Sequence, residues 1–593
     1  MNHLSYLNKF FYKYRRHLLL GILFVFASNY FRSLQPQIIR DALDLVIENL
    51  GAYNKMVDGP EKQALYGEIG KKLLYFGGVV LGLALLMGVF MYFMRQTIIV
   101  MSRLVEYDMR KEIFAHYEKL TTAFYKRNNT GDLMSRISED VSKVRMYVGP
   151  AILYGINLVS LFILVIYSML KVNVELTLYS LAPLPILSFS IYYISSIINK
   201  KSESIQQQIA SLNSTAQEVY SGIRVVKSYV QEKATGNFFA GQSETFKAKS
   251  LELAKVEAFF HPLMALLIGI STVITVYIGG LQVAKGTVTA GNIAEFVIYV
   301  NMLTWPVTAI GWIASLYQQA AASQKRINEF LQVQPEILSP VNNPVDIKGH
   351  IKFEKVAFTY PDTGIKALKK VSFELKPGEK MAIIGRTGSG KTSIGDLMLR
   401  LYDVTEGKIT IDGTDIREMD LDNLRQKLGY VPQDVFLFSD TIANNIGFGK
   451  DEFTREEVET FAKHAAIYND IKDLPQGFDT MVGERGVTLS GGQKQRVSIA
   501  RALIKRPDVL ILDDCLSAVD TDTEKQILGY FSGALADKTA IIITHRIYSQ
   551  LEFDKIIVLD DGEIVEEGKH ADLLELGGYY AELHKKQDAS LIS

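Results

Sequence analysis

The stretch VSFELKPGEKMAIIG, residues 371–385, ends in GRTGSGKT, residues 385–392, and this junction decides the fold of the second half of the chain. Residues 371–385 are a short β-rich run, and a helical run follows residues 385–392. The spacing Gly-x-x-x-x-Gly-Lys-Thr between a strand and a helix is that of a phosphate-binding loop. The order predicts an α/β P-loop domain of the RecA-like kind.

The loop also predicts which residues hold a nucleotide. Its glycines let the backbone turn tightly with N–H groups aimed at phosphate, and the helix N-terminus adds a positive dipole. Lys391 is expected to bind the β- and γ-phosphates through its positive charge, and the Thr392 hydroxyl is expected to coordinate Mg²⁺. The expected ATP-binding residues of the loop are Gly385, Arg386, Thr387, Gly388, Ser389, Gly390, Lys391 and Thr392.

Two further motifs follow the loop. VLILDD, residues 509–514, is an apolar strand that ends in carboxylates, and Asp513 is placed to hold Mg²⁺ through water. Between the loop and this strand lies LSGGQKQR, residues 489–496. Ser490, Gly491 and Gly492 precede a helical run, so their amides can bind an anion. The three motifs together predict a site for ATP with Mg²⁺.

The first half of the chain has long apolar runs. Crossing a bilayer takes about 20 apolar residues, and the clearest candidate is LLYFGGVVLGLALLMGVFMYFM between Lys72 and Arg95. Six segments predict an all-α six-helix transmembrane domain; they lie near residues 17–38, 73–95, 148–170, 174–198, 258–281 and 292–317.

The charged connections predict the topology. Lysine and arginine concentrate at the N-terminus and in the two long connections, and basic residues favour the cytoplasmic side. We therefore expect a multi-pass protein of the cell inner (plasma) membrane, with the N-terminus and the ATP-binding domain in the cytoplasm. Residues 102–127 have helical periodicity, which predicts a helix extending beyond the bilayer.

Composition and charge exclude several other functions and structural features. The net charge of the 593 residues is −1 and charge is dispersed, so no nucleic-acid partner is expected. The single cysteine, Cys515, excludes an internal disulfide or a cysteine metal cluster. Prolines after the sixth segment mark a linker. The expected division is a transmembrane domain at 1–320, a linker at 321–345 and a nucleotide-binding domain with a helical subdomain at 346–593.

Taken together, these motifs resemble the ATP-binding-cassette (ABC) exporter family along essentially the whole chain. Besides LSGGQ, the resemblance rests on YVPQD (430–434), SAVD (517–520), ITHR (543–546), GERG (483–486) and TGDLMSRI from Thr130. It implies that Tyr360 stacks on adenine and that Gln433 contacts Mg²⁺. It also implies that His545 contacts the γ-phosphate and that Glu484 braces the membrane loops. The segment Ser490, Gly491, Gly492 and Gln493 is implied to cap the γ-phosphate of ATP held by a second subunit.

One position departs from the family pattern. Family members usually place glutamate directly after the Mg²⁺ aspartate to polarise the attacking water, and this chain has Asp514. Aspartate is one methylene shorter, and a misplacement of about 1 Å can cost about 10²-fold in rate. We therefore expect slow hydrolysis at the site built on Lys391, with a slower but working base as the alternative.

The intact LSGGQ can complete an active site on a partner that has the glutamate. An aspartate in place of the glutamate, together with an intact LSGGQ, resembles the degenerate half of a heterodimeric multidrug or lipid exporter. The resemblance implies that the protein carries out ATP-driven export of amphiphilic small molecules or lipids. A homodimeric exporter of the lipid-flippase type stays open, and so, with less support, does an ATP-gated channel or regulatory subunit. The transported substrate cannot be read from the residues.

Overall fold

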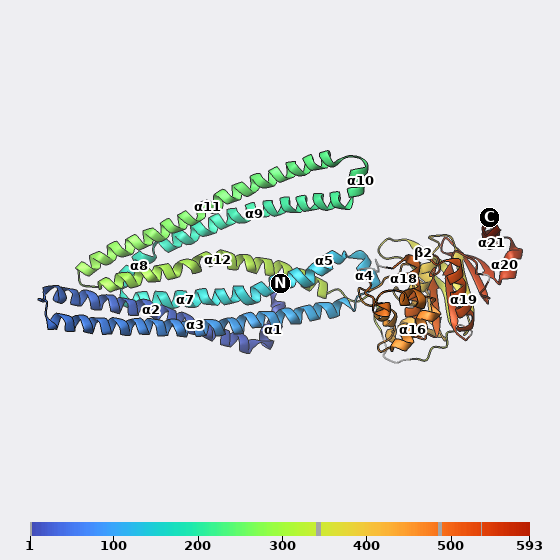
Figure 1. The fold of residues 1–593 in the computed structure, drawn as a ribbon, viewed down its shortest axis with the longest axis horizontal. Coiled ribbons are helices and arrows are strands. Elements are labelled where there is room, and N and C mark those ends of the chain that lie inside the picture. The colour runs from blue at the N-terminus through green and yellow to red at the C-terminus, as the bar shows by residue number, and fades with distance from the viewer. Residues whose placement is uncertain (1–2, 340–344, 484–488, 535–536, 549, 593) are drawn as a thin grey trace. The chain divides into compact units, whose positions relative to one another are not determined.

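The structure is a computed structural model that describes residues 3–339, 345–483, 489–534, 537–548 and 550–592. It contains two compact units. The first comprises Met1–His116 and Leu133–Val333, and the second comprises Tyr117–Asp132 and Gln334–Ser593. Figure 1 shows long helices in the first unit and packed helices and strands in the second.

The first unit confirms the predicted all-α six-helix domain. Among the described residues, six helical stretches are long and apolar enough to cross a membrane, and each predicted span lies inside one of them. Single helices form four of them, namely α2 (Arg15–Lys55), α3 (Pro60–Tyr117), α11 (Glu232–Ala284) and α12 (Ala290–Leu331). The other two stretches are each made of consecutive elements. The stretch Thr130–Val172 comprises α5 (Thr130–Ser135), η2 (Arg136–Asp140), α6 (Val141–Met146), η3 (Tyr147–Ala151) and α7 (Ile152–Val172), and the stretch Val174–Ser221 comprises α8 (Val174–Leu181) and α9 (Pro183–Ser221). Short helices are η1 (His3–Leu7), α1 (Asn8–Lys13) and α10 (Ile223–Ser228).

Two predicted helices are interrupted. The fourth span breaks at Ala182, because Pro183 has no N–H to donate and begins α9 at its first position. The helix predicted over residues 102–127, in contrast to the predicted spans, is wrong in its extent. Here α3 ends at Tyr117, and the separate helix α4 (Thr122–Arg127) belongs to the second unit.

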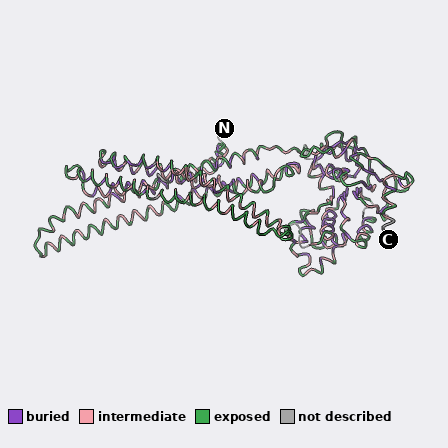
Figure 2. Tube along the Cα trace, turned by 90° about the horizontal axis from the view of Figure 1, so that it is seen from above, coloured by how far each residue is buried: buried purple, intermediate pink, exposed green. Residues whose placement is uncertain are grey.

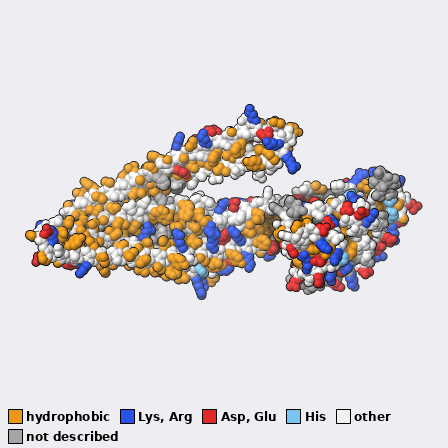
Figure 3. Space-filling view, viewed as in Figure 1, with side chains coloured by type: hydrophobic (Ala, Val, Ile, Leu, Met, Phe, Trp, Pro, Cys, Tyr) orange, Lys and Arg blue, Asp and Glu red, His pale blue; other side chains and the backbone are white. Residues whose placement is uncertain are grey.

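The outer surface of the first unit is apolar. On α3 the side chains of Leu74, Leu81 and Leu85 are 81%, 63% and 64% exposed. Hydrophobic side chains cover much of the visible face of this unit in Figure 3, and exposed residues run along its helices in Figure 2. Exposed apolar area on this scale is unfavourable in water, so this surface suits a lipid environment.

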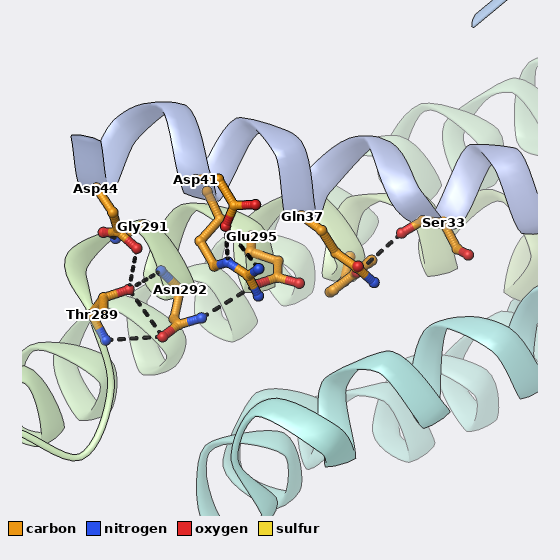
Figure 4. Close-up of polar contacts among 10 residues, drawn as sticks. Ser33, Gln37, Asp41, Asp44, Thr289, Gly291, Asn292 and Glu295 are labelled. Carbon is orange, nitrogen blue, oxygen red and sulfur yellow. Dashed lines mark hydrogen bonds and ion pairs between the residues drawn. The ribbon is translucent and has the colours of Figure 1, made fainter. Parts of the chain in front are cut away.

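Polar side chains join α2 to the start of α12 (Figure 4). The Asp44 carboxylate accepts hydrogen bonds from the Gly291 amide, at 2.8 Å, and from the Thr289 hydroxyl, at 2.6 Å. One turn away, the Arg40 guanidinium lies 3.1 Å from the fully buried Glu295 carboxylate. Burying a carboxylate is costly unless it is paired, so these contacts fix α12 against α2 at this end.

The second unit is built on two sheets. An antiparallel sheet has the order β2-β1-β4-β5, and a six-stranded sheet has the order β10-β9-β3-β8-β7-β6. In the larger sheet every pairing except β9 with β10 is parallel. The strands are β1 (Ile351–Thr359), β2 (Lys366–Leu375), β3 (Lys380–Gly385), β4 (Glu406–Ile411), β5 (Thr414–Asp415), β6 (Leu428–Val431), β7 (Val509–Asp513), β8 (Thr539–Thr544), β9 (Lys555–Asp560) and β10 (Glu563–Gly568).

Helices and an apolar core complete this α/β domain, as predicted. β7 and β8 read as continuous apolar runs because helices and loops cover both faces of a parallel sheet. The helical subdomain packs on α18 through a large buried cluster. The helices are α13 (Lys391–Met398), α14 (Leu421–Lys427), α15 (Ile442–Gly447), α16 (Arg455–His464), α17 (Tyr468–Lys472), α18 (Gly491–Ile504), α19 (Thr521–Ala534), α20 (His570–Leu576) and α21 (Tyr579–Ile592), with short turns η4 (Ile416–Glu418) and η5 (Gly477–Asp479).

Candidate nucleotide site

A cleft of about 880 Å³ opens at the carboxyl ends of the central parallel strands. The glycine-rich loop follows β3, Asp513 ends β7, and His545 follows β8. Neighbouring parallel strands end at the same edge of a sheet, which is where ligands bind in open α/β folds. Among the predicted site residues, the cleft is lined by Tyr360, Gly385, Arg386, Thr387, Gly388, Gly390, Lys391, Thr392, Gln433, Asp513, Asp514 and His545.

The loop is held in a phosphate-binding shape. Gly390 has φ +98°, and a Cβ there would lie 2.3 Å from the Ala367 carbonyl oxygen, so only glycine fits. The Lys391 ammonium donates to the carbonyl oxygens of Gly385 and Arg386, each at 2.8 Å. Burial lowers the pKa of Lys391, against the opposing effect of Asp513 and Asp514. Phosphate oxygens would relieve the cost of this buried cation. Ser389, the remaining residue of the loop, is buried and is not among the residues that line the cleft.

Asp513 has a carboxylate oxygen that could bind a cation. Its Oδ2 is buried and has no hydrogen-bond partner among the described residues, and burial raises its pKa to about 6. Thr392 and Gln433 line the same cleft. Carboxylate, hydroxyl and amide oxygens suit Mg²⁺, which usually takes few protein ligands and fills its remaining positions with water and phosphate oxygens. Among the described residues, no group of three His, Cys, Asp or Glu side chains could hold a metal by itself.

Asp514 is held on both sides. Its Oδ1 lies 2.9 Å from His545 Nδ1, and its Oδ2 accepts a hydrogen bond of 3.4 Å from Gln433 Nε2. The backbone of Asp514 has φ +46°, and its N–H donates to the Ile543 carbonyl oxygen. Of the three residues predicted to be catalytic, Asp514 therefore contacts both Gln433 and His545 through its carboxylate.

Tyr360 enters the cleft from the end of β1. Its hydroxyl shares a hydrogen bond of 2.9 Å with the hydroxyl of Ser393 on α13. Its ring packs edge-on against Phe358, with the centroids 4.7 Å apart, and against Tyr402, at 5.4 Å. Burial raises the pKa of the Tyr360 phenol. The ring is thus fixed as a flat wall of the cleft, as a base-stacking residue requires.

The LSGGQ residues are not part of this cleft. Ser490, Gly491, Gly492 and Gln493 start α18, and none of them lines it. The Ser490 hydroxyl accepts from the Gln493 amide, and the Gln493 side chain accepts from the Ser490 N–H. Gln493 also donates to Asp470, which pairs with Arg496 at 2.9 Å. The polar side chains of this segment are therefore satisfied by contacts within the unit. Glu484 lies outside the described residues.

Sequence reasoning missed a contribution from the C-terminal helix α21. Tyr579 and Leu583 line the cleft, and the Arg386 guanidinium lies 5.5 Å from the centroid of the Tyr579 ring. The side chain of Gln587 exchanges two hydrogen bonds of 2.9 Å with the backbone of Ile547, two residues after His545. No local motif marks these residues, because the contacts depend on how the chain folds back after β10.

Comparisons with known proteins agree with this geometry. Residues 18–307 match the family model "ABC transporter transmembrane region" and residues 368–517 match "ABC transporter". The chain is 35% identical over 587 residues to the probable multidrug resistance ABC transporter ATP-binding/permease protein YheI of Bacillus subtilis, covering 98% of this chain and 97% of the relative. It is 33% identical over 485 residues to the ATP-dependent lipid A-core flippase of Photobacterium profundum, covering 81% and 82%. The solved structure of a bacterial Atm1-family ABC exporter with ATP bound matches with a TM-score of 0.77 and 27% identity, covering 97% of this chain and 98% of that chain.

Proposed function

The chain belongs to the ABC transporter family and resembles its exporters, and from this premise we propose that it is the slow-hydrolysing half of a heterodimeric exporter. It exports amphiphilic small molecules or lipids across the inner membrane. Residues 1–320 form the transmembrane domain, 321–345 the linker and 346–593 the cytoplasmic ATP-binding domain. In its cleft Tyr360 stacks on adenine, Lys391 and the loop amides bind the phosphates, and Thr392, Gln433 and Asp513 hold Mg²⁺.

The observation that carries the proposal is the position of Asp514. A base that activates water must reach the γ-phosphate, and this carboxylate is one methylene short of glutamate and faces His545 and Gln433 instead. The separate, self-contained LSGGQ segment supports a second role for the chain. In this proposal Ser490–Gln493 close the cleft of a partner that has the glutamate.

Two apolar surfaces support a dimer. The tip between α9 and α11 exposes Tyr220, Val225, Tyr229 and Val230, each more than 60% accessible. On the second unit Phe436, Phe438 and Phe448 are 52%, 41% and 62% exposed. Neither surface suits water, and in this proposal each packs on the other subunit.

The test is to lengthen the carboxylate. We expect the wild-type chain without a partner to hydrolyse ATP slowly, and Asp514→Glu to raise hydrolysis up to about 10²-fold in the assembled transporter when the partner's own site is silenced. Asp508→Glu is a matched control, because it adds the same methylene at the other end of β7, where Asp508 pairs with Lys427 and Lys538. Brisk turnover by the wild-type chain alone, or no gain from Asp514→Glu in the complex, would refute the proposal.

A further inference from the structure

A lysine from the 117–132 segment lies against the tyrosine wall of the cleft. Lys126 is on α4, which belongs to the second unit. Its ammonium is 5.1 Å from the centroid of the Tyr360 ring and 5.3 Å from that of Tyr402. Both distances are within the range at which a cation is attracted to the face of an aromatic ring.

Neighbouring residues on α4 fix the position of this lysine. Ala123 is 2% exposed and packs in the same apolar cluster as Phe358 and Tyr402. At the end of the helix, Arg127 pairs with Glu336. The helix is thus anchored at both ends, and Lys126 projects between the anchors. Its place beside the two rings follows from packing, so it differs from a freely moving surface charge.

The lysine approaches Tyr360 from outside the cleft. Tyr360 lines the cleft, whereas Lys126 and Tyr402 are not among the described residues that do. A cation beside an aromatic ring is attracted to the ring and so restrains its orientation. A ring that is already held in place loses less conformational freedom when a base stacks on it, so it is the better stacking partner for adenine.

We propose that Lys126 is a positioning residue for base recognition, which acts on adenine through Tyr360. The proposal rests on the role of Tyr360 given above. It assigns part of the adenine affinity of this chain to a residue that lies, in sequence, between two predicted membrane helices. Adenine recognition here therefore depends on a segment outside the 346–593 domain.

The test compares a ligand that has a base with one that has none. The dissociation constants of ATP and of inorganic tripolyphosphate are measured on the purified full-length chain by the ligand-dependent rise in its unfolding temperature. We expect Lys126→Met to weaken ATP about two- to fivefold, the range for a partly exposed cation–aromatic pair. Tripolyphosphate, which does not contact Tyr360, should bind as in the wild type, and Lys126→Arg should restore ATP binding.

The matched control is Lys119→Met, which removes an exposed charge from the same 117–132 segment and leaves the Arg127–Glu336 pair and the two rings untouched. It should leave the ratio of the two dissociation constants unchanged. Equal weakening of both ligands by Lys126→Met, no weakening of ATP, or the same change in ratio with Lys119→Met would each overturn the proposal. A separate outcome concerns the proposed function. If the wild type binds ATP no more tightly than tripolyphosphate, the base adds no affinity and the adenine role of Tyr360 itself is wrong.

Discussion

The glycine-loop cleft and the LSGGQ segment lie in the same unit but satisfy their polar groups in opposite ways. In the cleft, Lys391 bonds to carbonyls of its own loop and Asp513 has a buried oxygen without a partner. In the LSGGQ segment, the capping box and Asp470 satisfy the side chains of Ser490 and Gln493. A buried polar group without a hydrogen-bond partner indicates a surface that binds a ligand. Polar groups that already have partners indicate a rigid surface, which can contact a ligand bound on another subunit. Under the proposed function, this difference predicts that ATP binds first to the cleft of one subunit and that the LSGGQ segment of the other subunit then closes on it.

The largest expected effect tests the cleft side of this comparison. Lys391→Met removes the ammonium group that donates to the carbonyl oxygens of Gly385 and Arg386 at the mouth of the loop. We expect ATP binding by the full-length chain to weaken at least about 10²-fold, because two charge-assisted hydrogen bonds to phosphate are lost. Equilibrium binding of ATP checks this. Retained binding would mean that the cleft does not use the lysine as inferred.

The pH dependence of Mg²⁺ binding is the next largest effect. The pKa of Asp513 rises from 3.8 to about 6 on burial, so the free chain holds this proton up to pH 6. Mg²⁺ must displace it, and we expect its affinity in the presence of ATP to fall about tenfold from pH 7.5 to pH 5. Without ligand the sign for stability is opposite. The folded chain binds the proton more tightly than the unfolded chain, so this group's contribution to stability decreases as pH rises from about 4 to 6.

Titrating Mg²⁺ at the two pH values measures the first effect, and Asp513→Asn supplies the comparison. That variant lacks the Asp513 proton, whereas the terminal phosphate of ATP titrates with both proteins, so the Mg²⁺ affinity of the variant should fall less between the two pH values. A fall that is equally large for the wild type and for Asp513→Asn would show that the cation does not bind at Asp513.

The smallest effect tests the LSGGQ side. Asp470→Asn weakens the support of Gln493 and Arg496 without touching the cleft. We expect hydrolysis by the assembled transporter to fall about two- to fivefold, the range for one weakened hydrogen-bonded pair, with ATP binding by this chain unchanged. The exposed neighbour Asp473 offers a control, since Asp473→Asn should change neither quantity. Weaker ATP binding in Asp470→Asn would contradict the separation of the two regions.

The sequence predicted the parts of this molecule that depend on local chemistry. A glycine loop between a strand and a helix has few alternatives, and spans of about 20 apolar residues are strong signals, so both domains were predicted with the correct fold class. The convergence of Gln433, Asp513, Asp514 and His545 followed from the family resemblance. The cleft contains all of them, and their catalytic and metal-binding roles stay predictions.

The features that were missed depend on long-range packing. Helical periodicity in 102–127 gave no sign of the break at 118–121, because the apolar pattern continues through it. Lys126 reads as an ordinary surface charge until α4 is placed beside Tyr360. Tyr579 and Gln587 lie far along the chain from the motifs that they contact, and a single sequence contains nothing that pairs them.

The exposed apolar side chains at the tip between α9 and α11 have a consequence for how the proposed heterodimer is made. A copy without its partner would display Tyr220, Val225 and Tyr229 to water, which favours self-association. In this proposal, matched synthesis of the two subunits limits that self-association, and overproduction of one subunit alone is expected to yield aggregates.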